Sequence, residues 1–565
     1  MASVGSRVGA EFIVDAFERH GIDRLYTFPG GTVAAIFDAA IARGIPIFTG
    51  RHEQGAGYAA LAAARLGGRP QVVLVTSGPG VTNLVTTVAD AYFDSTPLVV
   101  CTGQVGTGDM RGDLPVRQRG FQEVDTIALM RPITKEQILP RHPNEVPAAI
   151  ERAFRTASEG RPGPVVIDLP MNVQRGEVDE PAETPERQSA TPAAPDEALD
   201  AAAAALAGAQ RPLVIAGQGV LLAGATEELR ALVRGRGIPV SHSLLGLGAL
   251  PGDDPLALGF HGHTGNQYAG LAIHNADIVL VVGSRLDVRQ TGSEVADFAP
   301  GATIVRVEAD PAELDHSRIR TDIAVFGDAR AALAGLLERS GGGPDLAPWR
   351  EQIAAWRREH ALTVAAEGQL KPQEVIVAAN ELTRGRDFVV VTGVGLHQQW
   401  VARHFDVDFP RRPLLTSGGH GAMGYDLPTA VGAALQGREV LCFVGDGSLQ
   451  INIQELASVV DQELPIKIVV LDNHRLGIVS QFQLLNWGSD PTCGEKWNPD
   501  FAAIARAYGI PSWSVADRAE LVETLTEALA APGAALVHCA VDPEEDIVPM
   551  LLAGQRLDRM WPLGE

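Results

Sequence analysis

Two polar turns in the last third of the chain carry residue types that bind metal ions. Asp446 lies between Gly445 and Gly447 after the apolar run VLCFV, and Asp472 and Asn473 follow the apolar run IKIVVL. Both runs are predicted strands joined through a helix, and the carboxyl ends of such strands meet at one edge of a parallel sheet. A carboxylate and an amide oxygen at that edge suit Mg²⁺, which keeps diphosphate oxygens among its ligands. The sequence therefore predicts a metal and diphosphate site, although a Gly-Asp-Gly turn alone is common in proteins that bind no metal.

A second candidate functional residue, Glu53, lies in the first third of the chain. Glu53 follows the strand-like IPIFTG and begins the small-residue helix predicted for EQGAGYAALAAARLGG. At this position Glu53 is a candidate functional carboxyl group. The alternative is a solvated charge that is favoured by the dipole at the start of the helix.

These residues need a large scaffold to bring them together. At 565 residues the chain exceeds a single hydrophobic core, and we expect three units. Stretches rich in Pro, Glu, Ala and Gly around 175–197 and 340–348 are predicted linkers. Each third alternates Val, Ile and Leu runs with amphipathic segments, which is typical of parallel α/β units. The predicted strands include PQVVLVTS, TPLVVCTG, PLVIAG, ADIVLVVGS, ATIVRVE, DFVVVTG, EVLCFVGDG and IKIVVLDN.

The composition narrows the class of protein. A net charge of −23 argues against a nucleic-acid or anionic-membrane surface, so we expect small-molecule substrates. The four cysteines form neither a CxxC pair nor a disulfide framework. Residues 1–21 are predicted to form an amphipathic helix rather than a signal peptide, and no apolar run is long enough to cross a bilayer. We expect a cytoplasmic protein.

The order Gly-Asp-Gly, residues 448–472 and Asn473 resembles the signature of thiamine-diphosphate enzymes. The resemblance implies that Asp446, Asn473 and the backbone carbonyl of Arg475 hold the metal. It also implies that Glu53, in an RHEQGA-like motif, hydrogen-bonds the aminopyrimidine ring and promotes its imino form. In that family the glutamate and the metal motif of one active site come from different subunits, so we expect a homodimer or homotetramer.

The details look most like acetolactate synthase, an FAD-containing carboligase. Matching segments include YTFPGGTVAAIFDA, TSGPGVTNLVTTVADAYFDSTPLVVCTGQV, GFQEVD, RPITK, TGVGLHQQW, GGHGAMGYDLPTAVGAAL and DIVPML. The resemblance implies that Met423 supports the bent cofactor and that Phe121 and Gln122 lie at the substrate end. Without the family, Met423 and Phe121 are ordinary core residues, and His397 is a structural histidine at a helix start. The further cofactor contacts that the resemblance implies are Pro29, Gly30, Gly78, Asn83, Val394, Gly395, His397, Gly421, Gly445, Gly447, Ser448, Gly477 and Ile478.

The fold that the resemblance implies is α/β, with three domains of parallel sheet flanked by helices. The expected domains are pyrimidine-binding (1–180), central and FAD-binding-like (190–345), and diphosphate-binding (360–550). In the central domain, SHSLLGLGALPGDDPLALGFHG and GSRLDVRQTG resemble segments that wrap FAD. The implied FAD contacts are Gly217, Gly219, Leu245, His261, Gly283, Arg285, Arg289 and Asp310. A structural flavin and a redox-active flavin both fit, and the arginines can instead be solvated surface charges.

Several positions depart from acetolactate synthases. Phe482 stands at the tryptophan that helps to select the second 2-oxo acid, Leu396 replaces a glutamine, Asp472 replaces an asparagine, and His420 replaces a leucine. A longer loop brings Arg111, Arg117 and Arg119 towards the expected substrate mouth, unless they are only solvated. The segment LNWGSDPTCGEKWNPDF differs from the family's mobile loop and is a candidate lid.

The expected reaction is decarboxylation of pyruvate, or of a similar 2-oxo acid, and transfer of the acyl group to a carbonyl acceptor. A second pyruvate as acceptor gives acetolactate. The alternatives are acetyl transfer to another ketone or aldehyde, such as a keto sugar, and a pyruvate oxidase-like reaction in which FAD takes the electrons.

Overall fold

The computed structural model describes residues 7–179, 193–364 and 366–563. Three six-stranded sheets follow one another along the chain, and within these three sheets every strand pair with a defined register is parallel. The predicted α/β fold with three parallel sheets is therefore confirmed. The predictions for residues 1–6, at the N-terminus, and for 180–192, within the first predicted linker, lie outside the described residues.

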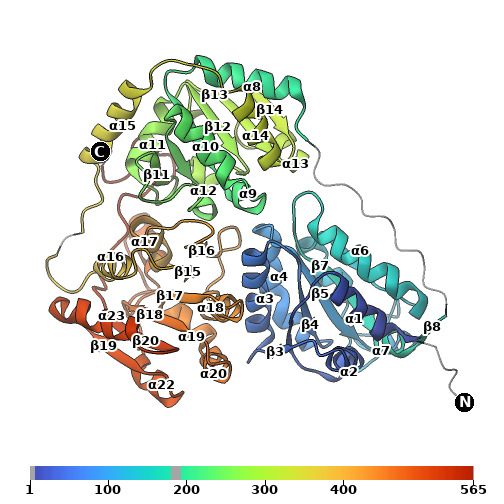
Figure 1. Ribbon diagram of the computed structural model, residues 1–565. Coiled ribbons are helices and arrows are strands. Elements are labelled where there is room, and N and C mark those ends of the chain that lie inside the picture. The colour runs from blue at the N-terminus through green and yellow to red at the C-terminus, as the bar shows by residue number, and fades with distance from the viewer. Residues whose placement is uncertain (1–6, 180–192, 365, 564–565) are drawn as a thin grey trace, which may run out of the picture. The chain divides into compact units, whose positions relative to one another are not determined.

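The first sheet has the strand order β3-β2-β4-β5-β7-β6. Apolar side chains of α1, α2 and α6 form a core on one of its faces, while α3 and α4 pack on the other (Figure 1). A separate antiparallel pair joins β1 to β8. The strands are β1 (Arg7–Val8), β2 (Leu25–Phe28), β3 (Ile47–Thr49), β4 (Gln71–Val75), β5 (Leu98–Gln104), β6 (Glu136–Ile138), β7 (Val165–Pro170) and β8 (Glu177–Val178). The helices are α1 (Gly9–Arg19), α2 (Ala34–Ala42), α3 (Glu53–Gly67), α4 (Pro79–Phe93), α5 (Thr126–Met130), α6 (Val146–Ser158) and α7 (Met171–Arg175).

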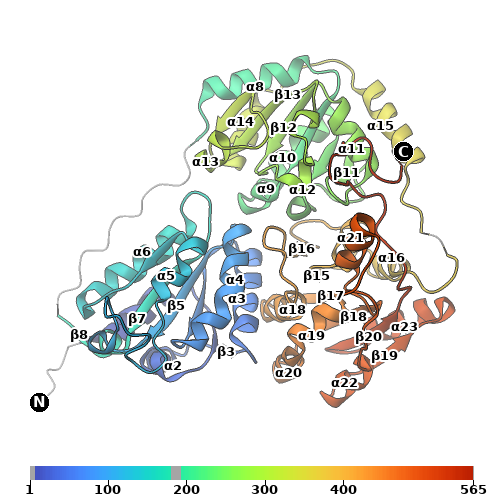
Figure 2. The same ribbon diagram turned by 180° about the vertical axis from the view of Figure 1, so that it is seen from behind.

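The second sheet has the order β11-β10-β9-β12-β13-β14. Helices α8, α10 and α14 build the core on one face, and α11 and α15 build it on the other (Figure 2). The strands are β9 (Pro212–Ala216), β10 (Val240–His242), β11 (Ala257–Phe260), β12 (Ile278–Val282), β13 (Thr303–Glu308) and β14 (Ile323–Phe326). The helices are α8 (Asp196–Gly208), α9 (Gln218–Leu222), α10 (Thr226–Arg236), α11 (Gln267–Asn275), α12 (Val288–Thr291), α13 (Pro311–Asp315), α14 (Ala329–Arg339) and α15 (Ala347–Glu359).

The third sheet has the order β16-β15-β17-β18-β20-β19, and α16, α17 and α23 cover one face. The strands are β15 (Phe388–Thr392), β16 (Leu414–Leu415), β17 (Glu439–Gly445), β18 (Ile466–Asp472), β19 (Ser512–Val515) and β20 (Ala535–Ala540). The helices are α16 (Pro372–Leu382), α17 (Leu396–His404), α18 (Asp426–Leu435), α19 (Asp446–Ile451), α20 (Leu456–Asp461), α21 (Gly477–Trp487), α22 (Phe501–Ala507) and α23 (Leu521–Ala530).

Packing divides the chain into two compact units that do not follow the order of the sequence. The first unit combines residues 1–190 with 417–438 and 450–466, and the second holds the remainder. In the first unit α18 lies directly on α3, where a Cβ atom on Gly432 would stand 2.2 Å from the carbonyl oxygen of Ala59. Only glycine permits this close approach of two helices.

Candidate functional site

The predicted metal turns lie side by side in the second unit, because β17 and β18 are neighbours in the third sheet. Asp446 is the first residue of α19, and Asn473 follows the last residue of β18. Their side chains are only 5% and 6% exposed. The backbone N–H of Arg475 donates to Asn473 Oδ1 at 3.1 Å, and its guanidinium donates to the Pro543 carbonyl at 2.6 Å. The side chain of Arg475 is therefore engaged elsewhere, which fits a role for its backbone alone.

The predicted diphosphate residues surround these turns. A Cβ atom on Gly395 or on Gly445 would stand 2.7 Å or 2.9 Å from His397 Nδ1, so His397 lies between the ends of β15 and β17. A Cβ atom on Gly477 would stand 2.9 Å from Asn473 Nδ2. Val394 precedes Gly395, Gly447 and Ser448 lie in the first turn of α19, and Ile478 lies in the first turn of α21. Three neighbouring strands thus present glycine turns and helix starts at one sheet edge, the arrangement that binds diphosphate.

Asn498 is a residue of this edge that the sequence analysis missed. Its Nδ2 atom donates to Asp446 Oδ2 at 2.6 Å and to Asp472 Oδ1 at 2.7 Å, while His538 Nε2 bonds Asp472 Oδ2 at 2.8 Å. Burial raises the pKa of Asp446 to about 6, and the Asp472 carboxylate adds to the rise. Burial also acts to raise the pKa of Asp472, but bonds from His538, His474 and Asn498 outweigh it, so that pKa is lowered.

The donor set at the metal turns mixes one carboxylate with amide and carbonyl oxygens. Among the described residues, no three His, Cys, Asp or Glu side chains group in a way that could hold a metal ion. A site built from Asp446, Asn473 and the carbonyl of Arg475 needs a hard ion that accepts neutral oxygens and brings further ligands of its own. These donors fit Mg²⁺ bound to diphosphate.

In the first unit, Glu53 begins α3 and is 5% exposed. Asn83 Nδ2 on α4 donates to Glu53 Oε2 at 2.9 Å, and His52 Nδ1 caps the helix by accepting from the N–H of Gln54 at 3.1 Å. The alternative of a solvated charge at the helix start is therefore wrong. Glu53 is a buried carboxyl group that accepts one side-chain hydrogen bond from the part of the chain that the structure describes.

The turns after β2 and β4 adjoin the helix start. A Cβ atom on Gly30, which follows Pro29, would stand 2.3 Å from Thr76 Cβ. Gly78 has a φ of +62°, and its Cβ would stand 2.8 Å from the Gln122 carbonyl oxygen. Both glycines are thus required by close packing. Phe121, beside Gln122, is 84% exposed, so the core alternative for this residue is wrong.

The segment that carries Gly421 and Met423 is also fixed within the first unit. The Asp94 carboxylate accepts from the N–H groups of Gly418 and Gly419 at 2.9 Å and 2.7 Å, and pairs with buried Arg65 at 2.7 Å. At the other end of the segment, Asn452 Nδ2 donates to the Gly424 carbonyl at 2.6 Å. Met423 is half-buried between these two anchors.

The arginine-rich loop is anchored at its base by Glu123, whose carboxylate accepts from the backbone N–H groups of Arg111, Arg119 and Gly120. Burial acts to raise the pKa of Glu123, but these three bonds outweigh it and lower the pKa. Arg117 and Arg119 are exposed and form no ion pair among the residues that the structure describes. Their role remains a prediction.

In the central domain, the predicted FAD contacts lie at the carboxyl ends of β9, β12 and β13 and on loops beside them. A Cβ on Gly217 would stand 2.1 Å from the Gly283 carbonyl, and Gly219 packs on the same glycine, so both are explained by backbone packing. Leu245 lies between Leu244 and Gly246 in a 3₁₀ turn, and Asp310 caps α13 by accepting from Ala312. Arg285 is 3.7 Å from Asp287, and Arg289 is exposed.

Among the predicted FAD contacts, His261 has the surroundings that most favour a bound ligand. The side chain is 2% exposed, its Nδ1 bonds Ser241 Oγ at 2.9 Å, and its Nε2 has no hydrogen-bond partner in the described part of the chain. Burial lowers its pKa to about 4. A buried nitrogen without a partner is uncommon, so the residues present fit a flavin with polar atoms at this edge.

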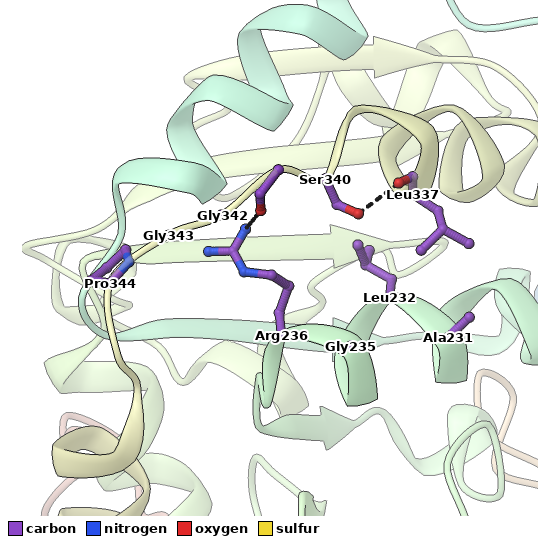
Figure 3. A pocket seen from close by; sticks show the side chains of 10 residues that line it. Ala231, Leu232, Gly235, Arg236, Leu337, Ser340, Gly342, Gly343 and Pro344 are labelled. Atoms are coloured by element: carbon purple, nitrogen blue, oxygen red, sulfur yellow. Dashed lines mark hydrogen bonds between the residues drawn. The ribbon is translucent and has the colours of Figure 1, made fainter.

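A pocket of about 350 Å³ lies elsewhere in this domain, where α10 and α14 end. Arg236, which lines this pocket (Figure 3), donates to the Gly341 carbonyl at 3.4 Å. In parallel α/β units helices end at the edge opposite the carboxyl ends of the strands. The pocket is therefore separate from the predicted FAD contacts.

Family models match all three sheets. The N-terminal TPP binding domain, the central domain and the C-terminal TPP binding domain of thiamine pyrophosphate enzymes match residues 7–129, 199–336 and 393–539. The chain belongs to this family. Thiamine pyrophosphate is another name for thiamine diphosphate, so the resemblance seen in the sequence is confirmed.

Relatives of this thiamine pyrophosphate enzyme are acetolactate synthase large subunits. The chain is 38% identical to that of Parasynechococcus marenigrum (strain WH8102), over 97% of this chain and 90% of the relative. It is 37% identical to the isozyme 3 large subunit of Escherichia coli (strain K12), over 98% of each. A probable large subunit of Methanocaldococcus jannaschii is 36% identical, over 97% and 94%. The chain is thus an acetolactate synthase-like member of the family.

None of the helices in the described ranges combines the length and apolarity that spanning a membrane requires.

Proposed function

We propose that this chain is an acetolactate synthase: it decarboxylates pyruvate and joins the acyl group to a second 2-oxo acid. The observation that carries the proposal is the meeting of Asp446, Asn473 and the glycine turns around His397 at the ends of three neighbouring strands, in a chain similar to acetolactate synthases over nearly its full length. Mg²⁺ and thiamine diphosphate are its proposed cofactors. Thiamine diphosphate, when bound, supplies the carbanion chemistry that breaks and forms the carbon–carbon bonds.

The protein contributes binding and proton control. Asp446, Asn473 and the Arg475 carbonyl would hold the metal, with the starts of α17 and α19 directed at the diphosphate. Glu53, held by Asn83 in a site with little water, would donate a proton to the aminopyrimidine ring and take it back. Met423, Phe121 and Gln122 would shape the space above the reacting atoms. The proposed domains remain 1–180 for the pyrimidine, 190–345 for FAD and 360–550 for the diphosphate.

We further propose that FAD binds to the central domain, with Arg285 and Arg289 near its phosphates and His261 as a polar contact. The proposed assembly is a cytoplasmic homodimer or homotetramer, because the family completes each active site from two subunits. The absorbance spectrum of the purified protein tests the flavin, and sedimentation tests the assembly.

Product analysis with pyruvate alone tests the central proposal. Acetolactate and carbon dioxide should both form, and thorough chelation of the divalent ion should release thiamine diphosphate. Carbon dioxide without acetolactate would overturn the proposed acceptor, and bleaching of flavin by pyruvate in the absence of oxygen would favour an oxidase instead. Retention of the cofactor after chelation would contradict the metal site.

A further inference from the structure

We propose that Asn498 is a positioning residue of the metal centre. Its amide nitrogen holds the Asp446 and Asp472 carboxylates together, and it fastens residues 488–500 to the segment that supplies the metal ligands. The inference rests on the proposed function, since it assigns a residue to the same metal site.

The first argument is the geometry of the amide group. Asn498 Nδ2 carries two hydrogens and lies 2.6 Å from Asp446 Oδ2 and 2.7 Å from Asp472 Oδ1, so one nitrogen serves two carboxylates. The Asp446 and Asp472 carboxylates lie close enough to repel each other. A neutral group that donates to both offsets this repulsion and fixes the torsion of the Asp446 side chain, on which the direction of its oxygens depends.

The second argument is that Asp472 is committed to protein donors. His538 Nε2 bonds its Oδ2 at 2.8 Å, and the His474 N–H donates to Oδ1 at 3.1 Å, in addition to the bond from Asn498. Both oxygens of Asp472 are therefore occupied by the chain itself. Asp472 anchors the amide of Asn498, while Asp446 is the carboxylate that the amide orients.

The third argument is that backbone hydrogen bonds join the loop carrying Asn498 to residues 474–476, beside the proposed metal ligands. The N–H of Lys496 donates to the His474 carbonyl at 2.7 Å, and the N–H of Leu476 donates to the Cys493 carbonyl at 3.1 Å. These bonds flank Arg475, whose carbonyl is a proposed metal ligand. Asn498 is the contact that extends this attachment to Asp446, at the end of the neighbouring strand.

The attachment implies that metal binding and loop order are linked. A bound ion fixes the torsion of the Asp446 side chain, so the bond to Asn498 then costs less side-chain entropy. By reciprocity, the loop must strengthen metal binding by the same factor as the metal strengthens the attachment of the loop. Lys496, beside the exposed Trp497, gives trypsin a cleavage site within the loop that reports its order.

The experiment compares full-length N498L with wild type. In the presence of thiamine diphosphate, Mn²⁺ affinity is measured by electron paramagnetic resonance, and trypsin cleavage after Lys496 is followed with and without Mn²⁺. We expect N498L to bind Mn²⁺ about 10- to 100-fold more weakly. We also expect faster cleavage and loss of the protection that Mn²⁺ gives to wild type.

The matched control is N486L, because the exposed Asn486 side chain donates to the Phe482 carbonyl of its own helix at 2.8 Å and has no other hydrogen bond among the described residues. It should stay within about twofold of wild type in both measurements. Adding D472N to N498L should restore part of the Mn²⁺ affinity, since it removes one of the two repelling charges. If N498L does not fold, N498S removes the same bonds with a smaller side chain.

Wild-type affinity in N498L and N498S would overturn the inference, as would equal losses in N486L. A wild-type protein that binds neither Mn²⁺ nor thiamine diphosphate would instead overturn the proposed function. The two failures are therefore distinguishable.

Discussion

Replacing Asn83 with leucine tests whether the buried Glu53 carboxyl needs its one described donor. The substitution keeps the approximate volume of the side chain and removes the bond from Asn83 Nδ2 to Glu53 Oε2, which is 2.9 Å long. Leaving a buried acceptor without its donor costs about 1–3 kcal/mol, which corresponds to about 5- to 150-fold in a rate that depends on it. We expect the C2 proton of bound thiamine diphosphate to exchange more slowly by a factor in this range.

The assay dilutes the enzyme with Mg²⁺ and saturating thiamine diphosphate into deuterium oxide, quenches with acid and follows the C2–H signal by nuclear magnetic resonance. Saturation separates positioning of Glu53 from loss of cofactor affinity. E53Q sets the lower limit of the rate. N275L is the control, because Asn275 is exposed at the end of α11 and its side chain donates to the Leu271 carbonyl, with no other side-chain hydrogen bond among the described residues. An N83L rate within about twofold of wild type, with E53Q slow, would refute the reasoning.

Three further substitutions probe the scaffold. In G55A the new Cβ would stand 2.1 Å from Glu455 Oε1, so we expect a loss of about 1–3 kcal/mol and a lower thermal midpoint; an unchanged midpoint would contradict this packing. D94N removes the carboxylate that pairs with the buried Arg65 side chain at 2.7 Å, which should cost about 3–5 kcal/mol and lower the midpoint further, whereas a neutral effect would show that the pair is dispensable. Burial lowers the pKa of His242 from 6.5 to about 4, so the folded protein binds fewer protons than the unfolded chain between these values. Stability should therefore fall as the pH drops from 6.5 towards 4, by up to about 3 kcal/mol; H242N should flatten this dependence of the thermal midpoint on pH, and an equal slope would argue against it.

The central strands could be predicted from the sequence because they are buried on both faces. The eight strands predicted from apolar runs are all present, including β4, β12 and β18. In an α/β protein a short continuous apolar run usually forms a strand that is buried on both faces. Two of the edge strands, β6 and β16, carry no such signal. β6 consists of Glu136, Gln137 and Ile138, all half-buried, and β16 is only two residues long. Neither contains an apolar run that could be recognised.

The proposed metal site could be predicted from the sequence because a single motif contains both of its side-chain ligands. Asp446 and Asn473 are joined by a single strand–helix–strand unit, whose spacing fixes where they meet. Asn498 could not be found in this way, because it reaches the metal turns from an irregular loop that has no periodicity. The one signal available was Asp472: a second carboxylate at this edge requires a donor, and an asparagine downstream is a suitable one.

The close packing of α18 on α3, which leaves no room for a side chain at Gly432, has a consequence for synthesis on the ribosome. The surface of α3 that α18 covers cannot be buried until residues 426–435 have emerged, long after residue 190. At about 5–20 residues per second, the N-terminal sheet waits roughly 10 to 50 s with that apolar surface exposed. We therefore expect the nascent chain to expose, during synthesis, an apolar surface that is covered in the finished protein. A fragment ending near residue 190 should aggregate rather than fold.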